Sequence, residues 1–307
     1  MKYKLAIHGG AGTIKKKMLS EKEEQDYKNA LSNALELGEG MLKKGMLALD
    51  VVEQVVKSLE DVPLFNAGRG SVFTHEGTHE MDASIMCGKT LRAGSVAAVR
   101  NIRNPITLSR RVLEKSGFVF LVGRGAEAYA KLEGIEMADD SYFFTDYRYN
   151  QWQELKGDNQ VSLDHKESKK FGTVGAVALD IHGDLAAATS TGGLTNKRYG
   201  RVGDSPIIGA GNYANNNTCA VSCTGYGEYF IRSVVAYDIS CLIEYANFSL
   251  EDACKKVVHE KLVTVGGEGG LIAIDKGGNI AMPFNTDGMY RASIGSEKSD
   301  FNIAIYR

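Results

Sequence analysis

The chain lacks the features of a membrane protein and of a nucleic-acid-binding protein. Its 307 residues contain no run of about 18 or more apolar residues, so we expect no membrane-spanning helix. Lysine and arginine (36) nearly balance aspartate and glutamate (38), and a net charge of −2 argues against a broad nucleic-acid surface. The first residues lack the long apolar stretch of a signal peptide. We therefore expect a cytoplasmic protein without nucleic-acid or membrane partners.

Cysteine is scarce and its spacing does not suggest a metal site. The five cysteines are Cys87, Cys219, Cys223, Cys241 and Cys254. An odd number without a secretion signal favours reduced thiols over a disulfide framework. Cys219 and Cys223 lack the Cys-x2-Cys spacing that is typical of zinc sites, so we expect them to pack in the core.

The order of the predicted elements favours an α+β fold. Apolar periodicity and cap residues predict helices over 20–44, 47–59, 105–115, 126–132, 227–246 and 249–263, with a capping box at Ser20 and Glu23. They predict strands over 2–8, 71–74, 81–86, 93–100, 118–122, 174–179, 185–188, 219–222, 271–275, 279–284 and 301–306. Strands and helices both come in pairs, which favours two sheets packed face to face with helices outside.

Two further stretches are predicted to be irregular. The glycine-rich residues 9–12 predict a tight turn after the first strand, because glycine accepts backbone conformations that other residues avoid. Residues 136–170 are polar and charged without a lasting period, so we interpret them as a linker that is mobile over about 150–171.

Two motifs imitate known sites in the wrong structural context. His75-Glu-Gly-Thr-His79 matches the zinc-protease string, which requires a helix to bring both histidines to one face. Here it contains a glycine and lies between predicted strands, so we interpret it as a hairpin tip and keep a zinc protease as an alternative. Gly209-Ala-Gly-Asn-Tyr-Ala214 imitates a dinucleotide fingerprint, but no helix is expected directly after it.

The stretch 172–225 carries most of the reactive residues. Thr173 directly follows Gly172 and opens an apolar run that is typical of a buried strand. A threonine hydroxyl needs a base, and the threonine's own α-amine can serve once the preceding peptide bond is cut. That amine titrates at roughly 7.7–8.0, so part of it is neutral near pH 7. On this dipeptide alone, a Gly-Thr step that merely opens a core strand remains the simpler interpretation.

Several motifs in order resemble the isoaspartyl peptidase/L-asparaginase family, the plant-type asparaginases among the N-terminal nucleophile hydrolases. They are Ile7-His-Gly-Gly-Ala-Gly12, Phe65-Asn-Ala-Gly68, Met81-Asp-Ala-Ser84, Gly172-Thr-Val-Gly-Ala-Val-Ala-Leu-Asp180, Thr189-Ser-Thr-Gly-Gly193, Gly200-Arg-Val-Gly-Asp-Ser-Pro206, Ser222-Cys-Thr-Gly225 and Pro283-Phe-Asn-Thr-Asp-Gly-Met-Tyr-Arg291. The resemblance covers nearly the whole chain. It implies a single domain over 1–307 with a four-layer αββα sandwich.

The resemblance also implies a self-processing amidohydrolase. The precursor would split between Gly172 and Thr173 into an α chain (1–172) and a β chain (173–307), which assemble as a heterotetramer of two α and two β chains. Thr173 would be the nucleophile, Thr191 would hold its hydroxyl, and Thr224 with the N–H of Gly225 would form the oxyanion hole.

The same resemblance assigns the substrate contacts. Arg201 would bind the α-carboxylate and Asp204 the α-ammonium of L-asparagine or a β-aspartyl peptide, while Asn66 would support the nucleophile. Taken alone, Arg201 and Asp204 would equally suit a surface ion pair. A glycosylasparaginase and a non-catalytic binding protein remain alternatives.

No catalytic cofactor is expected, but the loop 59–69 resembles the family's sodium loop. Backbone carbonyls would bind the monovalent cation, because hard cations prefer oxygen ligands. The implied donors are the carbonyls of Leu59, Glu60, Val62, Phe65, Ala67 and Arg69.

Overall fold

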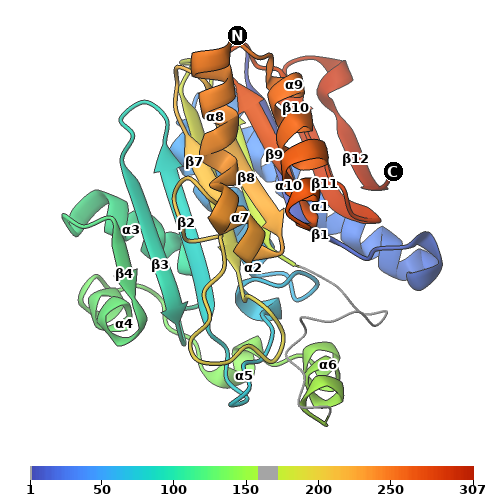
Figure 1. The fold of residues 1–307 in the computed structure, drawn as a ribbon. Helices are drawn as coiled ribbons and strands as arrows, with labels where there is room; N and C mark the ends of the chain where they lie inside the picture. The colour runs from blue at the N-terminus through green and yellow to red at the C-terminus, as the bar shows by residue number, and fades with distance from the viewer. Residues whose placement is uncertain (1, 158–171) are drawn as a thin grey trace.

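The computed structural model describes residues 2–157 and 172–307 (Figure 1). The strands are β1 (Lys4–Gly12), β2 (Met81–Cys87), β3 (Ala93–Val99), β4 (Phe120–Val122), β5 (Val174–Leu179), β6 (Leu185–Thr191), β7 (Asn212–Ala214), β8 (Cys219–Gly225), β9 (Gly269–Asp275), β10 (Ile280–Ala281), β11 (Gly288–Gly295) and β12 (Asn302–Tyr306). The helices are α1 (Glu21–Lys43), α2 (Ala48–Glu60), α3 (Pro105–Lys115), α4 (Gly123–Leu132), α5 (Asp140–Phe143), α6 (Asp146–Gly157), α7 (Gly227–Ser233), α8 (Val235–Ala246), α9 (Leu250–Lys255) and α10 (Leu262–Thr264). A π-helical segment, Lys256–Lys261, joins α9 to α10.

Two sheets form the middle of this α+β structure. The larger has eight strands in the order β12-β11-β1-β5-β6-β2-β3-β4, and the smaller has four in the order β10-β9-β8-β7. All neighbouring strands are antiparallel except β3 and β4. Strands β1, β5 and β6 contact β8 or β9, so the sheets stack face to face.

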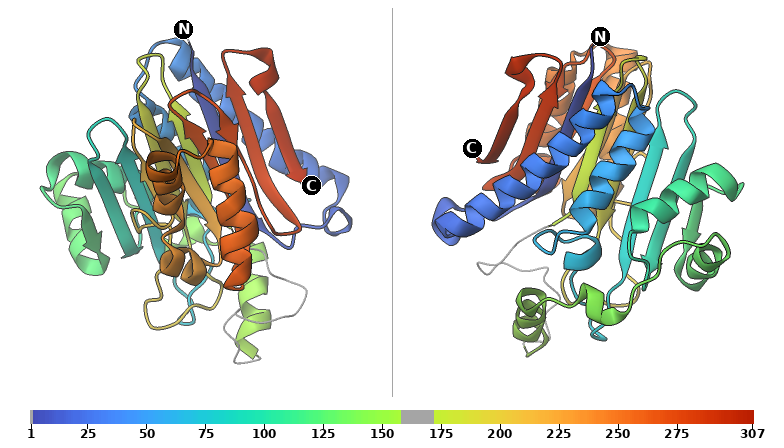
Figure 2. Two further views of the ribbon diagram at one scale, coloured as in Figure 1. Left: turned by 45° about the horizontal axis from the view of Figure 1, so that its top comes forward. Right: turned by 180° about the vertical axis from the view of Figure 1, so that it is seen from behind.

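Helices cover the outer face of each sheet (Figure 2). Helices α1, α2 and α3 pack on the larger sheet, while α8 and α9 pack on the smaller one. The alternation of side chains along β5 shows why: Val174 and Ala176 belong to the core beneath α1 and α2, whereas Val177 belongs to the core between the sheets. Successive residues of a strand point to opposite faces, so a strand buried on both sides is apolar throughout.

Most predicted elements are present, and the first helix begins as expected. The Ser20 side chain accepts from the backbone N–H of Glu23, and Glu23 accepts from the N–H of Ser20, which is a complete capping box. The predicted strand 174–179 is confirmed, and the strand predicted to end at Ala188 continues to Thr191. Thr173, directly before β5, and Thr191, at the end of β6, therefore lie at the same end of two paired strands.

The tight turn predicted at residues 9–12 was wrong. Strand β1 continues through Gly12, and its register with β11 shifts between His8 and Gly10. Gly10 has a φ of 112°, and a Cβ on Gly9 would lie 2.3 Å from the Phe65 ring. The glycines therefore allow a bulge and a close approach rather than a reversal of the chain.

The linker predicted from residue 136 was also wrong over the described part, which contains α5 and α6. Trp152 is buried and stacks on Phe73 at 5.4 Å between ring centroids, and Phe143 is fully buried. Aromatic side chains thus anchor these polar helices to the fold. The remainder of the predicted mobile segment, 158–171, lies outside the described residues.

Three smaller differences separate the structure from the sequence predictions. Residues 71–74 form no strand and make only one bridge, Thr74 to Lys197. The helix predicted over 227–246 breaks at Val234, which adopts a left-handed φ of 48°. Strand β11 was not predicted. No helix among the described residues is long and apolar enough to cross a membrane.

Candidate active site

The two threonines of the predicted site lie side by side at the ends of β5 and β6. The Thr173 hydroxyl donates to Thr191 Oγ1 at 3.2 Å, and the Thr191 hydroxyl donates to the carbonyl oxygen of Gly172 at 3.0 Å. The backbone N–H of Gly193 donates to Thr191 Oγ1 at 3.1 Å. Antiparallel pairing of Val174 with Ser190 produces this arrangement. Thr191 therefore contacts both the predicted nucleophile and the oxygen of the predicted cleavage bond.

His8 holds the backbone of Thr173 from the inner side. Its Nδ1 lies 3.0 Å from the Thr173 carbonyl oxygen and its Nε2 lies 2.9 Å from Ser222 Oγ. The carbonyl can only accept, so Nδ1 carries the proton and Nε2 accepts from Ser222. Burial lowers the pKa of His8 to about 3, so the ring is neutral at pH 7. His8 fixes the position of Thr173, a contact that the sequence analysis missed.

Asn66 packs against the predicted cleavage bond. Its Nδ2 donates to the Gly193 carbonyl at 2.7 Å, and its Oδ1 accepts from the Val72 N–H at 3.0 Å. A Cβ on Gly172 would lie 2.4 Å from the Asn66 Cβ. Asn66 therefore links the segment between α2 and β2 to Gly193, and only glycine fits at position 172 without a shift of Asn66.

Arg201 is held by a residue that the sequence analysis missed, Glu228. Arg201 Nε and Nη2 donate to the two carboxylate oxygens of Glu228 at 2.9 and 2.8 Å. The guanidinium has five N–H donors, so Nη1 remains available to a ligand. The Arg201 side chain lines the same cleft as Thr173 and Thr191. Glu228 thus fixes the orientation of Arg201 within the cleft.

Asp204 supplies a buried acceptor in this cleft. Its side chain is 5% exposed, and among the described residues no hydrogen-bond donor reaches Oδ2. Burial raises the pKa of Asp204 to about 7. The nearby positive charge of Arg201 lowers this pKa, but by less than burial raises it. A buried carboxylate oxygen without a partner is costly unless a ligand donates to it. An ammonium group of a ligand would satisfy this oxygen.

Thr224 and Gly225 lie at the end of β8. The Thr224 hydroxyl accepts from the backbone N–H of Ala11 at 3.2 Å, and Gly225 lines the cleft of Thr173. A Cβ on Gly225 would lie 2.5 Å from the carbonyl oxygen of Glu268. The bulged strand β1 therefore positions the Thr224 hydroxyl, while close packing requires glycine at position 225.

The predicted cation loop begins at the end of α2, and two glycines at its far end pack closely against carbonyl oxygens. A Cβ on Gly68 would lie 2.5 Å from the Glu60 carbonyl oxygen, and one on Gly70 would lie 2.1 Å from that of Phe65. The Leu59 and Ala67 carbonyls accept from the N–H groups of Val62 and Gly70 but retain a second lone pair. Carbonyl oxygen is the type of donor that a hard monovalent cation prefers.

The Glu60 side chain has a different environment from its carbonyl. Its Oε1 accepts from Ser190 Oγ at 2.6 Å and from the Ile106 N–H at 3.1 Å, inside the core. Burial raises the pKa of Glu60 to about 8, so the carboxyl is neutral at pH 7.

Neither imitating motif has the helix that its function requires. The hairpin tip predicted at 75–79 was nevertheless wrong, because 71–74 form no strand. Residues 75–79 form a turn, in which the N–H of Thr74 donates to the Thr78 carbonyl at 2.7 Å. Within the ranges 2–157 and 172–307, no group of three or more His, Cys, Asp or Glu side chains could hold a metal. The glycines at 209 and 211 lead into strand β7 rather than a helix. A zinc protease and a dinucleotide site are therefore not supported.

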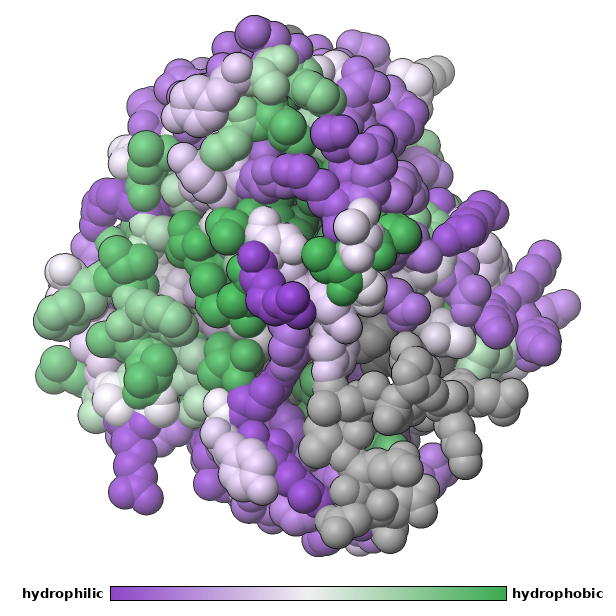
Figure 3. Space-filling model, in the orientation of Figure 1, coloured by the Kyte–Doolittle hydropathy of each residue, from purple (hydrophilic) through white to green (hydrophobic). Residues whose placement is uncertain are grey.

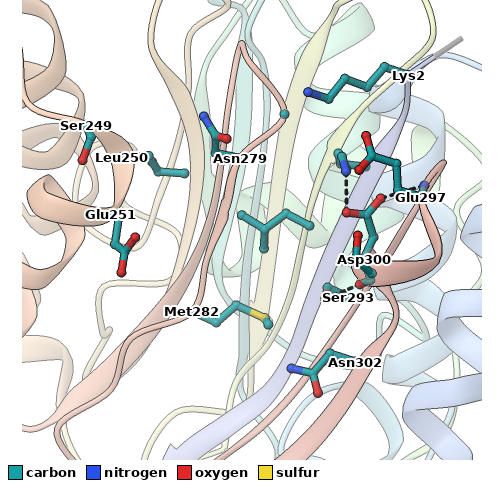
Figure 4. A pocket seen from close by; sticks show the side chains of 14 residues that line it. Lys2, Ser249, Leu250, Glu251, Asn279, Met282, Ser293, Glu297, Asp300 and Asn302 are labelled. Carbon is teal, nitrogen blue, oxygen red and sulfur yellow. Dashed lines mark hydrogen bonds and ion pairs between the residues drawn. The ribbon is translucent and has the colours of Figure 1, made fainter.

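A second, surface cavity lies apart from the cleft of Thr173 (Figure 4). It lies between the edge of the smaller sheet, α9 and β12, and Lys4 in it pairs with Asp300. Ser293 Oγ donates to the Asp300 carbonyl at 2.7 Å. Glu251 in the lining pairs with Lys255 outside it, and the cavity shares no lining residue with the cleft of Thr173.

Comparison with known proteins identifies the family of the chain. The family model described as asparaginase matches residues 1–303. An isoaspartyl peptidase of Escherichia coli is 54% identical over 293 residues, which cover 94% of this chain and 91% of that protein. A plant-type L-asparaginase of Pyrococcus horikoshii is 41% identical over 304 residues, covering 93% and 94%. An isoaspartyl peptidase/L-asparaginase of Xenopus laevis is 40% identical over 306 residues, covering 100% and 96%. The chain therefore belongs to the asparaginase family.

Proposed function

We propose that the protein hydrolyses β-aspartyl dipeptides and L-asparagine with Thr173 as an N-terminal nucleophile, and releases L-aspartate. It is an isoaspartyl peptidase/L-asparaginase, as its relatives are named. One observation carries the proposal: the hydroxyl chain from Thr173 through Thr191 to the Gly172 carbonyl. It joins the nucleophile to the bond that must break before the nucleophile can work.

The same pair of hydrogen bonds supports self-cleavage of the polypeptide. The Thr173 oxygen would attack the Gly172 carbonyl carbon while the Thr191 hydroxyl stabilises the developing negative charge on the carbonyl oxygen. The bond from Gly172 to the Thr173 nitrogen breaks, the nitrogen takes up the proton lost by the hydroxyl, and water hydrolyses the resulting ester. The products are an α chain (1–172) and a β chain (173–307) of one domain.

Turnover would then use the freed α-amine as the base. The Thr173 oxygen attacks the β-carbonyl of the substrate, and Thr224 with the Gly225 N–H would donate to its oxygen. Arg201 would bind the substrate α-carboxylate through Nη1, and Asp204 would accept from the α-ammonium. The amine returns its proton to the leaving nitrogen, and water releases aspartate from Thr173.

The wider architecture supports the remaining expectations. The two stacked sheets with helices on each outer face correspond to the αββα sandwich of N-terminal nucleophile hydrolases. Carbonyl oxygens of the loop 59–69 would hold a sodium ion that stabilises the strand-end loops. A heterotetramer would bury the apolar surface at the β4 edge, where Phe118, Val119, Phe120 and Val122 are exposed (Figure 3).

The Thr173→Ala variant tests the proposal. We expect it to remain one chain in a denaturing gel, because no hydroxyl can attack Gly172, and to lack activity on β-aspartyl dipeptides. Wild-type protein should give two chains, the smaller beginning Thr-Val-Gly, and Thr173→Ser should cleave more slowly as the matched control. An active wild-type protein that stays uncut would refute the mechanism, and an inactive uncut one would favour a binding protein.

A further inference from the structure

A buried cation with no carboxylate partner lies close to the cleavage bond. Arg148, in helix α6, is 4% exposed. Its Nε donates to the Gly70 carbonyl at 2.8 Å and its Nη1 to Gln151 Oε1 at 3.2 Å, while its guanidinium lies over the Tyr147 ring. Among residues 2–157 and 172–307, no carboxylate lies within ion-pair distance of it. Burial lowers the pKa of the guanidinium, which marks its environment as unfavourable for charge.

Such a group is costly to keep in a folded protein. A charge that is removed from water without a counter-charge loses its hydration and gains no ion pair in return. Arginine also retains unused donors here, because no acceptor among the described residues pairs with Nη2 or with the second hydrogen of Nη1. Both features suit a group that binds an anionic ligand in its planar fork.

Arg148 lines a cleft that adjoins the nucleophile from the opposite side. Gly172, Asn66 and Tyr290 line the same cleft. The cleft of Arg201 and Asp204 is a separate space, and Gly172 is the one residue that lines both. Release of Gly172 from Thr173 would therefore remove the wall between the two clefts.

The chemistry of the leaving group points to the Arg148 side. The freed Thr173 amine must give its proton to the leaving nitrogen, so that nitrogen lies next to the amine. In the uncleaved chain the atom bonded to this amine belongs to Gly172. The departing part of a substrate therefore takes the space that Gly172 leaves. For asparagine that part is ammonia, but for a β-aspartyl dipeptide it is an amino acid with its own α-carboxylate.

We propose that Arg148 binds the α-carboxylate of the leaving residue of β-aspartyl dipeptides. The inference rests on the proposed role of Thr173 as an N-terminal nucleophile. It assigns opposite ends of a dipeptide to two arginines, Arg201 for the aspartyl head and Arg148 for the leaving residue. It also makes Arg148 the residue that favours dipeptides over asparagine, because asparagine offers it no carboxylate.

The first test uses the processed wild-type enzyme and needs no variant. The kcat/KM values of β-aspartyl-alanine, its C-terminal amide and L-asparagine are compared. A charge-assisted hydrogen bond predicts that the amide is worse than the free acid by roughly ten- to a hundredfold. Equal values for the acid and the amide would overturn the proposal. Equal values are also expected if the new carboxylate of Gly172 stays bound to Arg148, because Arg148 then does not bind the substrate and the proposal is equally overturned.

The second test compares Arg148→Met with Lys156→Met. Lys156 lies on the same helix with its Nζ over the Trp152 ring at 4.3 Å, and it lines neither cleft. We expect Arg148→Met to lose the ten- to hundredfold preference for the acid over the amide while activity on asparagine stays within about twofold. Lys156→Met should keep the preference.

The tests separate this inference from the proposed function. Equal losses on all three substrates in Arg148→Met would mean that the side chain only supports the fold, and would overturn the inference. If this variant does not fold, the wild-type comparison of acid and amide decides alone. Absence of hydrolysis by processed wild-type protein, or activity in Thr173→Ala, would instead refute the role of Thr173.

Discussion

Glu228→Gln is expected to weaken substrate binding, although residue 228 acts only through Arg201 and does not itself contact the substrate. Glu228 accepts two hydrogen bonds from Arg201, at 2.9 and 2.8 Å, and so fixes the guanidinium that faces the cleft. Glutamine keeps the shape and one acceptor oxygen, but it loses the negative charge and one of the two bonds. Arg201 then becomes free to turn toward Asp204, its other acidic neighbour.

The size of the effect follows from the geometry. A hydrogen bond between charged groups contributes about 1.5–3 kcal/mol. The Glu228 side chain is 41% exposed, so screening by water reduces this to about 1–2 kcal/mol. One factor of ten corresponds to about 1.4 kcal/mol, so we expect KM for β-aspartyl-alanine to rise roughly 5- to 30-fold. The kcat should change little, because the proposed contact of Arg201 with the head of the substrate would be equally strong in the ground and transition states.

Steady-state kinetics on processed protein measures both constants. Asp238→Asn is the matched control, because Asp238 accepts two bonds from Lys261 on the surface away from the cleft. It should leave KM and kcat unchanged. An unchanged KM in Glu228→Gln, or a fall in kcat with a constant KM, would refute the positioning role of Glu228.

Three further predictions concern other buried polar groups. Thr224→Ala should lower kcat by about 10²–10³ while the chain still cleaves in a denaturing gel, since Gly172 presents a different carbonyl; an unchanged kcat rules out the oxyanion role. Asp204, with a pKa of about 7, and the Thr173 amine, with a pKa of about 7.7–8.0, must both be deprotonated for activity. A plot of log(kcat/KM) against pH should therefore approach a slope of two below pH 7, and a slope of one would exclude a role of the Asp204 carboxylate in substrate binding. The pKa of Glu60 rises from 4.5 to about 8 on folding, so its contribution to stability is full below pH 4.5 and is lost as the pH rises through 8. The Tm of Glu60→Gln minus the Tm of the wild-type protein should therefore be larger at pH 8 than at pH 5. The same difference at both pH values would contradict this.

Local patterns were sufficient for elements whose environment their own residues define. The capping box at Ser20 and the unbroken apolar run of 174–179 predicted α1 and β5, because a cap and a strand buried on both faces leave a local signal. The polar composition after residue 136 misled, because the aromatic residues that anchor α5 and α6 pack on residues far away in the chain. Glycines 9–12 predicted an unusual backbone, but the choice of a bulge over a turn depended on pairing with β11.

By itself, the sequence determined which side chains could do the chemistry: the Gly172-Thr173 step, the paired threonine and the Arg201 and Asp204 pair are present as residue types in order. The tertiary structure decided what each of them contacts. Register between β5 and β6 brought Thr191 to the Gly172 carbonyl, folding of α7 placed Glu228 on Arg201, and α6 brought Arg148 beside Gly172. The first two of these contacts join residues 19 and 27 positions apart, and the contact of Ile106 with Glu60 spans 46 positions. Periodicity reports the burial of a residue, whereas the identity of its partner depends on how the sheets and helices pack.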